Sequence, residues 1–323
     1  MFKRLPIFAV LFALILSTAG LHAARPREIW ERYSVAYIGE RKDDSSNGPI
    51  IAGARAEADV LEHQYHLAVT ILDLTPAEPN DQKESLRQAY LQGVKAVLIR
   101  PVDAASIQDQ LDTLQKQGIG VVTLDGDVPE TMRLMNVHTD ESALAQLAFD
   151  EAKKRLPRRG RLAILAGDAG NPISAERLAT ITAAAEADSK VTIRGVYPCQ
   201  EDVSDAFNVL RQVEAADRDE TIDGWIFVGP WPLKSAATLP WRPGEKVCIS
   251  IEALPPNLAY LASQQVDALI AEEYVQWGKI GMNAAIQFVQ KQEMPEMDQT
   301  TGGSVISGQN LDQVSQDWAD WLL

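Results

Sequence analysis

The chain has 323 residues, 46% of them hydrophobic, and a formal net charge of −15 at pH 7. This length allows one large or two medium domains. The negative charge argues against nucleic acid and anionic membranes as partners, and two cysteines are too few for a disulfide scaffold.

The first 23 residues have the layout of a secretory signal peptide. Lys3 and Arg4 precede an apolar run over residues 5–16, and small residues follow it. The run is shorter than the roughly 20 apolar residues that a membrane-spanning helix needs. We therefore expect residues 1–23 to be cleaved on export and the mature protein to be located in the periplasm.

The first half of the mature chain alternates short apolar runs with amphipathic segments. Strands are predicted at residues 33–39, 67–74, 94–102, 120–124 and 135–140, and helices at residues 48–64, 81–93, 104–117 and 141–156. Apolar strands that alternate with helices are typical of a parallel sheet covered on both faces.

The same alternation begins again after a turn rich in Pro, Gly and Arg at residues 156–161. Strands are predicted at residues 161–168, 191–198, 224–230, 246–252 and 266–271, and helices at residues 174–188, 203–216 and 277–290. Two such runs predict an α/β protein with two doubly wound parallel-sheet lobes.

Polar residues stand directly after several predicted strands, at Asp125, Gly167–Asp168, Gly229–Trp231 and Glu252. Ligands of open α/β sheets bind outside the carboxyl ends of the strands. A carboxylate there can accept two hydroxyl protons in strong, charge-assisted hydrogen bonds. We therefore predict that Asp125 accepts hydrogen bonds from a ligand, whereas Asp127, after Gly126, is assigned to the turn or to a supporting position behind the ligand contacts.

The order and spacing of five segments resemble the type I periplasmic sugar-binding proteins, which include the ribose- and galactose-binding proteins. The segments are residues 53–74, 92–107, 118–127, 167–181 and 266–285, and the likeness extends from about Tyr33 to Gly308. The resemblance implies a three-segment hinge that closes on a ligand, with crossings near Thr139, Glu272–Val275 and Gly302–Ser307. The lobes would then be residues 25–139 plus 273–303 and residues 140–272 plus 304–323.

The resemblance also implies a set of ligand-binding residues. Asp125 and Arg177 stand at family ligand positions, Glu252 replaces a family aspartate, and Glu272 replaces a polar residue at the hinge. Further candidates are Asp44 and Asn47 in the loop after the first strand, Asp140, Glu201 and Trp231. For Asp140, capping of the helix over residues 141–156 is the simpler interpretation.

Several of these positions depart from the family pattern. Ser46 and Asn47 replace an aromatic pair that stacks on the sugar, and Glu201 replaces another aromatic residue. Trp231 either supplies the missing stacking surface or belongs to the core. The carboxylate-rich set fits a neutral polyhydroxy ligand or a cationic amino compound, and it argues against phosphates and dicarboxylates. We expect no catalytic residue, cofactor or metal.

The motifs of enzymes, metal sites and DNA-binding repressors are weak in this sequence or missing from it. The triplet Asp125–Asp127 matches the D-x-D motif of glycosyltransferases, in which carboxylates hold a divalent ion, but the secretion signal and the second α/β half count against an enzyme. No nucleophile elbow or Walker-type motif is present. His63 and His66 are better explained as exposed side chains than as metal ligands. The acidic chain and its leader exclude a repressor that binds DNA.

The predicted partners are a small sugar or polyol and either an ABC-type permease or, as the main alternative, a membrane sensor kinase or chemoreceptor. We expect a monomer. Cys199 and Cys248 should form no disulfide, because their strands are not adjacent in the order 2-1-3-4. Residues 295–303 and 316–323 are expected to follow the last crossing and to pack away from the ligand.

Overall fold

The computed structural model describes residues 30–291 and 298–322. The predicted signal peptide at residues 1–23 lies outside the described residues. Within the described ranges, no helix is both long and apolar enough to cross a membrane.

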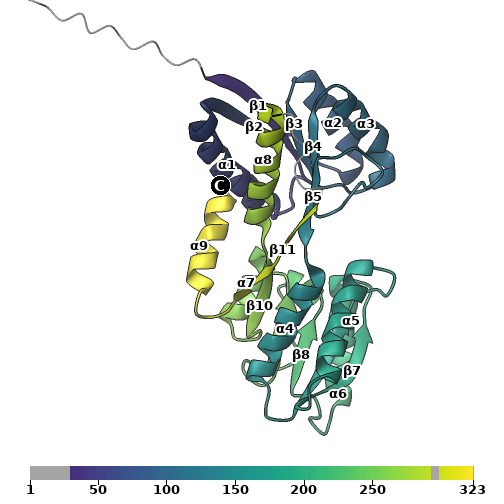
Figure 1. The fold of residues 1–323 in the computed structure, drawn as a ribbon. Helices are drawn as coiled ribbons and strands as arrows, with labels where there is room; N and C mark the ends of the chain where they lie inside the picture. Colours follow the sequence, from purple (N-terminus) through teal and green to yellow (C-terminus); the bar gives the residue numbers. More distant parts are fainter. Residues whose placement is uncertain (1–29, 292–297, 323) are drawn as a thin grey trace, which may run out of the picture. The chain divides into compact units, whose positions relative to one another are not determined.

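The first sheet has six parallel strands (Figure 1). Their order is β2 (Leu67–Asp73), β1 (Glu31–Ile38), β3 (Ala96–Ile99), β4 (Gly120–Leu124), β5 (Met135–Thr139) and β11 (Asp298–Thr301). The helices packed on it are α1 (Asn47–Tyr65), α2 (Gln82–Leu91), α3 (Ala104–Lys116) and α8 (Tyr274–Lys291).

Both faces of this sheet are buried. Val35 and Tyr37 of β1 belong to the apolar cluster that contains α1, whereas Ala36 and Ile38 belong to the cluster that contains α2 and α3. Successive side chains of a strand point to opposite faces, so an unbroken apolar run is what a doubly covered strand requires.

The second sheet repeats the same plan. Its order is β7 (Val191–Pro198), β6 (Gly160–Ala166), β8 (Gly224–Phe227), β9 (Val247–Ile251), β10 (Ala268–Glu272) and β12 (Gly303–Ile306), and only β12 is antiparallel to its neighbour. Its helices are α4 (Glu141–Arg155), α5 (Pro172–Glu186), α6 (Val203–Ala216) and α7 (Pro255–Ala262). The prediction of two doubly wound α/β lobes is confirmed.

The chain passes between the two sheets three times. It leaves the first sheet between β5 and α4, returns between β10 and α8, and leaves again at Gly302, between β11 and β12 (Figure 1). Thr301 ties these segments together: its hydroxyl accepts a hydrogen bond from Trp277 Nε1 at 2.9 Å, and its carbonyl accepts one from the backbone N–H of Asp140 at 2.9 Å.

Two glycines allow α1 and α8 to pack backbone against backbone. A Cβ added at Gly53 would lie 2.0 Å from the carbonyl oxygen of Val275, and one added at Gly278 would lie 1.9 Å from that of Ile50. Real Cβ atoms do not approach so closely, so both positions require glycine. The contact fixes the start of α8, directly after the second crossing.

The C-terminal part differs from its prediction. Asp298–Thr301 precede the last crossing and form β11 of the first sheet, so the prediction that residues 295–303 follow that crossing was wrong for residues 298–301. Residues 292–297 lie outside the described ranges. Helix α9 (Leu311–Trp321) follows the crossing and packs against both α1 and α7. It therefore contacts helices of both sheets rather than one.

The two cysteines are far apart in the sheet order, as predicted. Cys248 lies in β9 and Cys199 directly follows β7, and strands β6 and β8 stand between them. Both are buried free thiols.

Candidate functional site

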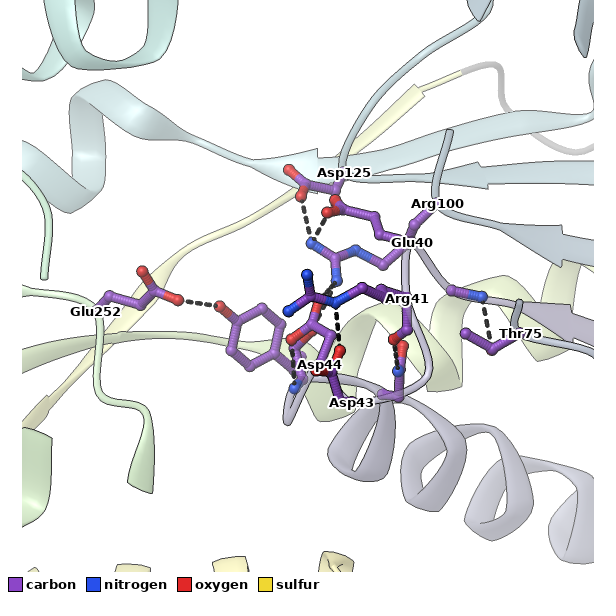
Figure 2. A network of polar contacts seen from close by, with 12 residues as sticks. Glu40, Arg41, Asp43, Asp44, Thr75, Arg100, Asp125 and Glu252 are labelled. Atoms are coloured by element: carbon purple, nitrogen blue, oxygen red, sulfur yellow. Dashed lines mark hydrogen bonds and ion pairs between the residues drawn. The ribbon is translucent and has the colours of Figure 1, made fainter. Parts of the chain in front are cut away.

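A buried arginine gathers acidic side chains at the carboxyl ends of the first sheet. Arg100 directly follows β3, and its side chain is 8% exposed. Its Nη1 donates to Asp44 Oδ2 at 2.7 Å and to Ser46 Oγ at 2.6 Å. Its Nη2 donates to Asp125 Oδ2 at 2.9 Å and lies 3.0 Å from Glu40 Oε1 (Figure 2). One guanidinium thus holds three carboxylates and a hydroxyl.

The remaining nitrogen of this guanidinium, Nε, has no acceptor within the described part of the chain. Arg100 Nε is buried and makes no hydrogen bond to any described residue. The indole ring of Trp277 lies beside the group, with the guanidinium carbon 5.9 Å from the ring centroid. The negative face of the ring stabilises the cation, which compensates in part for the missing acceptor.

A second buried arginine binds acidic side chains at the carboxyl end of the second sheet. Arg177 of α5 is also 8% exposed, and it donates from Nε to Glu141 Oε2 at 2.5 Å and from Nη2 to Glu272 Oε1 at 2.7 Å. Its Nη1 donates to the carbonyl of Val228 at 3.1 Å. Glu141 follows the first crossing and Glu272 precedes the second, so Arg177 joins two of the crossing segments.

Glu252 connects the carboxyl end of the second sheet to α8. It directly follows β9, and its Oε1 accepts a hydrogen bond from the hydroxyl of Tyr274 at 3.1 Å (Figure 2). Tyr274 is the first residue of α8, which packs on the first sheet. The contact therefore links a loop of one sheet to a helix of the other.

The acidic side chains of both sheets act on one another electrostatically. Burial, together with the charges of Glu252 and Asp125, raises the pKa of Glu272 to about 8 against the opposing effect of Arg177. Burial also raises the pKa of Glu141 and of Glu252. Asp125 belongs to the first sheet and the three glutamates to the second, so the two ends form one electrostatic unit.

The pKa values of the two acidic residues beside Arg100 in the loop after β1 shift in opposite directions. Burial raises the pKa of Glu40, with Arg100 opposing it. Burial acts in the same direction on Asp44, but Arg100 and the hydrogen bonds from Ser46 hold the pKa of Asp44 below its ordinary value. Asp44 is therefore a charged acceptor at neutral pH.

The side chains of two predicted site residues form hydrogen bonds with nearby parts of the chain. The amide oxygen of Asn47 accepts a hydrogen bond from the Tyr37 hydroxyl at 2.8 Å, and its Nδ2 donates to the carbonyl of Arg41 at 2.8 Å. Asp140 caps α4 through the backbone N–H of Ala143 at 2.8 Å, as the simpler interpretation has it. Asn47 therefore stabilises the loop after β1, and Asp140 stabilises the start of α4.

Glu201 and Trp231 form a separate group beside β6. The carboxylate of Glu201 accepts hydrogen bonds from Ser174 Oγ at 2.6 Å and from Asn171 Nδ2 at 2.9 Å. A Cβ added at Gly167 would meet Glu201 at 2.3 Å and the Trp231 ring at 2.8 Å. Trp231 is 9% exposed and belongs to the apolar core.

The two aspartates of the D-x-D triplet point to different partners. Asp127 accepts hydrogen bonds from Arg133, at 2.6 Å to Nη2, and from the backbone N–H of Val128 at 2.7 Å, whereas Asp125 pairs with Arg100. Among the residues that the structure describes, no group of three His, Cys, Asp or Glu side chains could hold a metal ion.

Sequence reasoning missed several residues of this site: Glu40, Ser46, Arg100, Glu141, Lys234 and Tyr274. Arg100 carries the signal that identified Asp125, a charged residue directly after an apolar strand. Glu141 and Tyr274 begin helices after crossings, and their role depends on contacts across the fold. Lys234 is exposed, and its charge lowers the pKa of Glu252.

Comparison with known proteins identifies the family. A family model described as a periplasmic binding protein domain matches residues 35–293. The chain belongs to this family. The resemblance to type I periplasmic sugar-binding proteins is thereby confirmed, although no curated protein gives a significant match.

Solved structures of periplasmic binding proteins share the fold. A periplasmic ribose ABC transporter protein from Conexibacter woesei is 17% identical, with a TM-score of 0.72 over 90% of this chain and 97% of that chain. AraP, an arabinose-binding protein from Geobacillus stearothermophilus, is 15% identical, with a TM-score of 0.73 over 88% and 99%. A solute-binding protein from Burkholderia graminis in complex with D-arabinose is 22% identical, with a TM-score of 0.65 over 86% and 96%.

Proposed function

We propose that this protein is an exported, monomeric solute-binding protein of the periplasm that captures a small hydroxylated ligand, a sugar or polyol, and delivers it to an ABC-type permease. The observation that supports it most is the gathering of acidic and basic side chains from the carboxyl ends of both sheets, in a member of the periplasmic binding protein family. Ligands of such sheets bind there.

Two carboxylates keep an oxygen available for a ligand. Asp125 bonds to Arg100 through Oδ2, and Glu252 bonds to Tyr274 through Oε1. Their other oxygens, Asp125 Oδ1 and Glu252 Oε2, receive no hydrogen bond from the described part of the chain. An ionised carboxylate oxygen is a strong acceptor for a hydroxyl. No catalytic residue, cofactor or metal enters this proposal.

Closure of the two lobes on the ligand is the second part of the proposal. The predicted lobes are residues 25–139 plus 273–303 and residues 140–272 plus 304–323; Gly303 moves to the second lobe because it begins β12 of the second sheet. The three crossings between the lobes act as the hinge. Small-angle scattering of the mature protein with and without a bound sugar tests this step. A smaller radius of gyration with ligand supports closure, and an unchanged radius with ligand bound contradicts it.

A sensor is the second candidate function. One solved structure that shares the fold is a complex of XylFII with LytSN; it is 18% identical, with a TM-score of 0.69 over 87% of this chain and 100% of that chain. In this alternative the liganded protein presents its signal to a membrane histidine kinase. Genes for a permease and an ATPase beside this gene support transport, whereas a kinase gene supports sensing.

A further inference from the structure

The proposed site carries more negative than positive charge. Its carboxylates are Glu40, Asp44, Asp125, Glu141, Glu252 and Glu272, and the cations acting on them are Arg100, Arg177 and Lys234. Six acidic groups therefore face three basic ones. The place of the site is given independently of this charge, by the ends of the sheets and by the family.

Every terminal nitrogen of the two buried arginines already donates to an acceptor of the protein. Both Nη atoms of Arg100 are occupied, by Asp44 and Ser46 on one side and by Asp125 and Glu40 on the other. Both Nη atoms of Arg177 donate as well, to Val228 and Glu272. The carboxylate partners neutralise much of the charge of both arginines, so the site attracts an anionic ligand less than a cationic one.

Closing a site over uncompensated carboxylates is unfavourable, because each charge loses its water. A cation on the ligand removes this cost. A protonated amine has a positive charge and up to three N–H donors, and Asp125 Oδ1 and Glu252 Oε2 are acceptors without a partner among the described residues. Arg100 holds Asp44 and Asp125 on one guanidinium group, and burial and the charge of Asp44, which is ionised at neutral pH, raise the pKa of Glu252.

Building on the function proposed above, we propose that the ligand is a hydroxylated amine, an amino sugar or amino polyol, whose ammonium group binds among Asp44, Asp125 and Glu252. Its hydroxyl groups then take the remaining carboxylate oxygens. A purely neutral sugar would bring no counterion for these negative charges when the lobes close.

Protonation of the carboxylates is the alternative way to neutralise the excess negative charge of the site. The pKa of Glu272, raised to about 8 by burial, leaves this group largely protonated at about pH 6.5. The charged groups acting on it are Arg177, Glu252, Asp125 and Glu141. An ammonium ion favours the charged carboxylates and releases protons on binding, whereas a neutral sugar that displaces water favours the protonated forms and takes protons up. Binding of an amine and binding of a neutral sugar therefore change the number of bound protons in opposite directions.

Calorimetric titration at about pH 6.5 in phosphate and in Bis-Tris buffer distinguishes them, because the amine is then already protonated before it binds. The ligands are glucosamine, galactosamine and mannosamine, each compared with its parent hexose and its N-acetyl derivative. We expect at least one amine to bind about tenfold or more tightly than both of its neutral counterparts, with proton release. Glu252→Gln should reduce this preference, whereas Glu130→Gln, at an exposed position, should leave it unchanged.

The outcomes separate the two proposals. A neutral hexose that binds as tightly as its amine, with proton uptake, overturns the amine inference and leaves the solute-binding function intact. No binding by any compound of either series contradicts both. An amine preference that Glu252→Gln leaves untouched overturns the assignment of the ammonium position.

Discussion

Asp125 and Glu252 occupy equivalent positions in the two sheets. Each directly follows the fourth strand of its half, and each has a left-handed backbone, with φ of 64° and 81°. Each donates its backbone N–H to the next strand, to Val137 and Ile270 respectively, at 2.7 Å in both cases. Such a backbone costs a non-glycine residue roughly 1–2 kcal/mol. In both halves of the protein, a strained backbone conformation thus places a carboxylate beyond the end of the strand.

Asp125→Asn tests the acceptor role without disturbing the backbone, because asparagine tolerates the left-handed region well. Hydrogen bonds to charged groups contribute about 1.5–3 kcal/mol, so we expect ligand affinity to fall roughly 10- to 100-fold in calorimetric titration. Asp127→Asn is the matched control, since Asp127 pairs with Arg133, and it should keep the affinity. Equal affinities of Asp125→Asn and the unchanged protein would contradict the assignment.

Glu252→Gly and Glu252→Ala separate strain from ligand binding. Both variants remove the carboxylate, and both should bind ligand more weakly. Only glycine relieves the backbone at φ 81°, so the glycine variant should be more stable than the alanine variant by about 1 kcal/mol in urea unfolding. Greater stability of the alanine variant would show that the left-handed conformation costs nothing at this position.

Glu272 predicts a pH dependence of the free energy of unfolding. Its pKa is raised to about 8 by burial, so the folded state binds this proton more tightly than the unfolded state does. The resulting stability is complete below pH of about 4.5, the ordinary glutamate value, and is lost as the pH rises through about 8. The loss is at most about 1.4 kcal/mol per pH unit.

Urea unfolding of the ligand-free protein between pH 5.5 and 8.5, a range of roughly three units around the shifted pKa, checks this prediction. Relative to Glu272→Gln, the unchanged protein should become progressively less stable as the pH rises. Glu130→Gln, at an exposed carboxyl group, should run parallel to the unchanged protein. Parallel curves for Glu272→Gln as well would mean that Glu272 titrates normally.

Gly278→Ala should destabilise the contact between α1 and α8. The added Cβ would lie 1.9 Å from the Ile50 carbonyl oxygen, and a clash with backbone cannot be relieved by a side-chain rotation. We expect a loss of roughly 2–3 kcal/mol or more in thermal unfolding. Gly302→Ala is the control, because nothing lies within 4 Å of its Cβ position. Equal stability of the two variants would rule out the close helix contact.

Much of the fold could be predicted because its strands are buried on both faces. The apolar runs that become β3, β4, β8 and β9 are unambiguous. The missed strands β11, DQTT, and β12, GSVI, are four residues each, and neither is an unbroken apolar run. They form because they continue existing sheets, a cause that no local pattern contains. Helix α7 is eight residues long, too short for a clear period.

The candidate site was partly predictable for a related reason. Asp125 and Glu252 could be identified because each charge directly follows an apolar strand, and Arg100 offered the same signal. Spacing could not show that Asn47 bonds to Tyr37 of β1 or that Glu201 bonds to Ser174 of α5, since this depends on how their amide and carboxylate groups are oriented. The pairing of Arg177 with Glu141 and Glu272 joins residues far apart in sequence.

The most direct test of the account is a thermal-shift screen of the mature protein and its Asp125→Asn variant against sugars, polyols and their amino derivatives. A ligand at a hundred times its dissociation constant adds about 2.7 kcal/mol, or roughly 5 °C in Tm. We predict such a shift for at least one compound, and a smaller one for the variant. No shift with any of them, or a shift only with a divalent metal plus a nucleotide sugar, would contradict a solute-binding function.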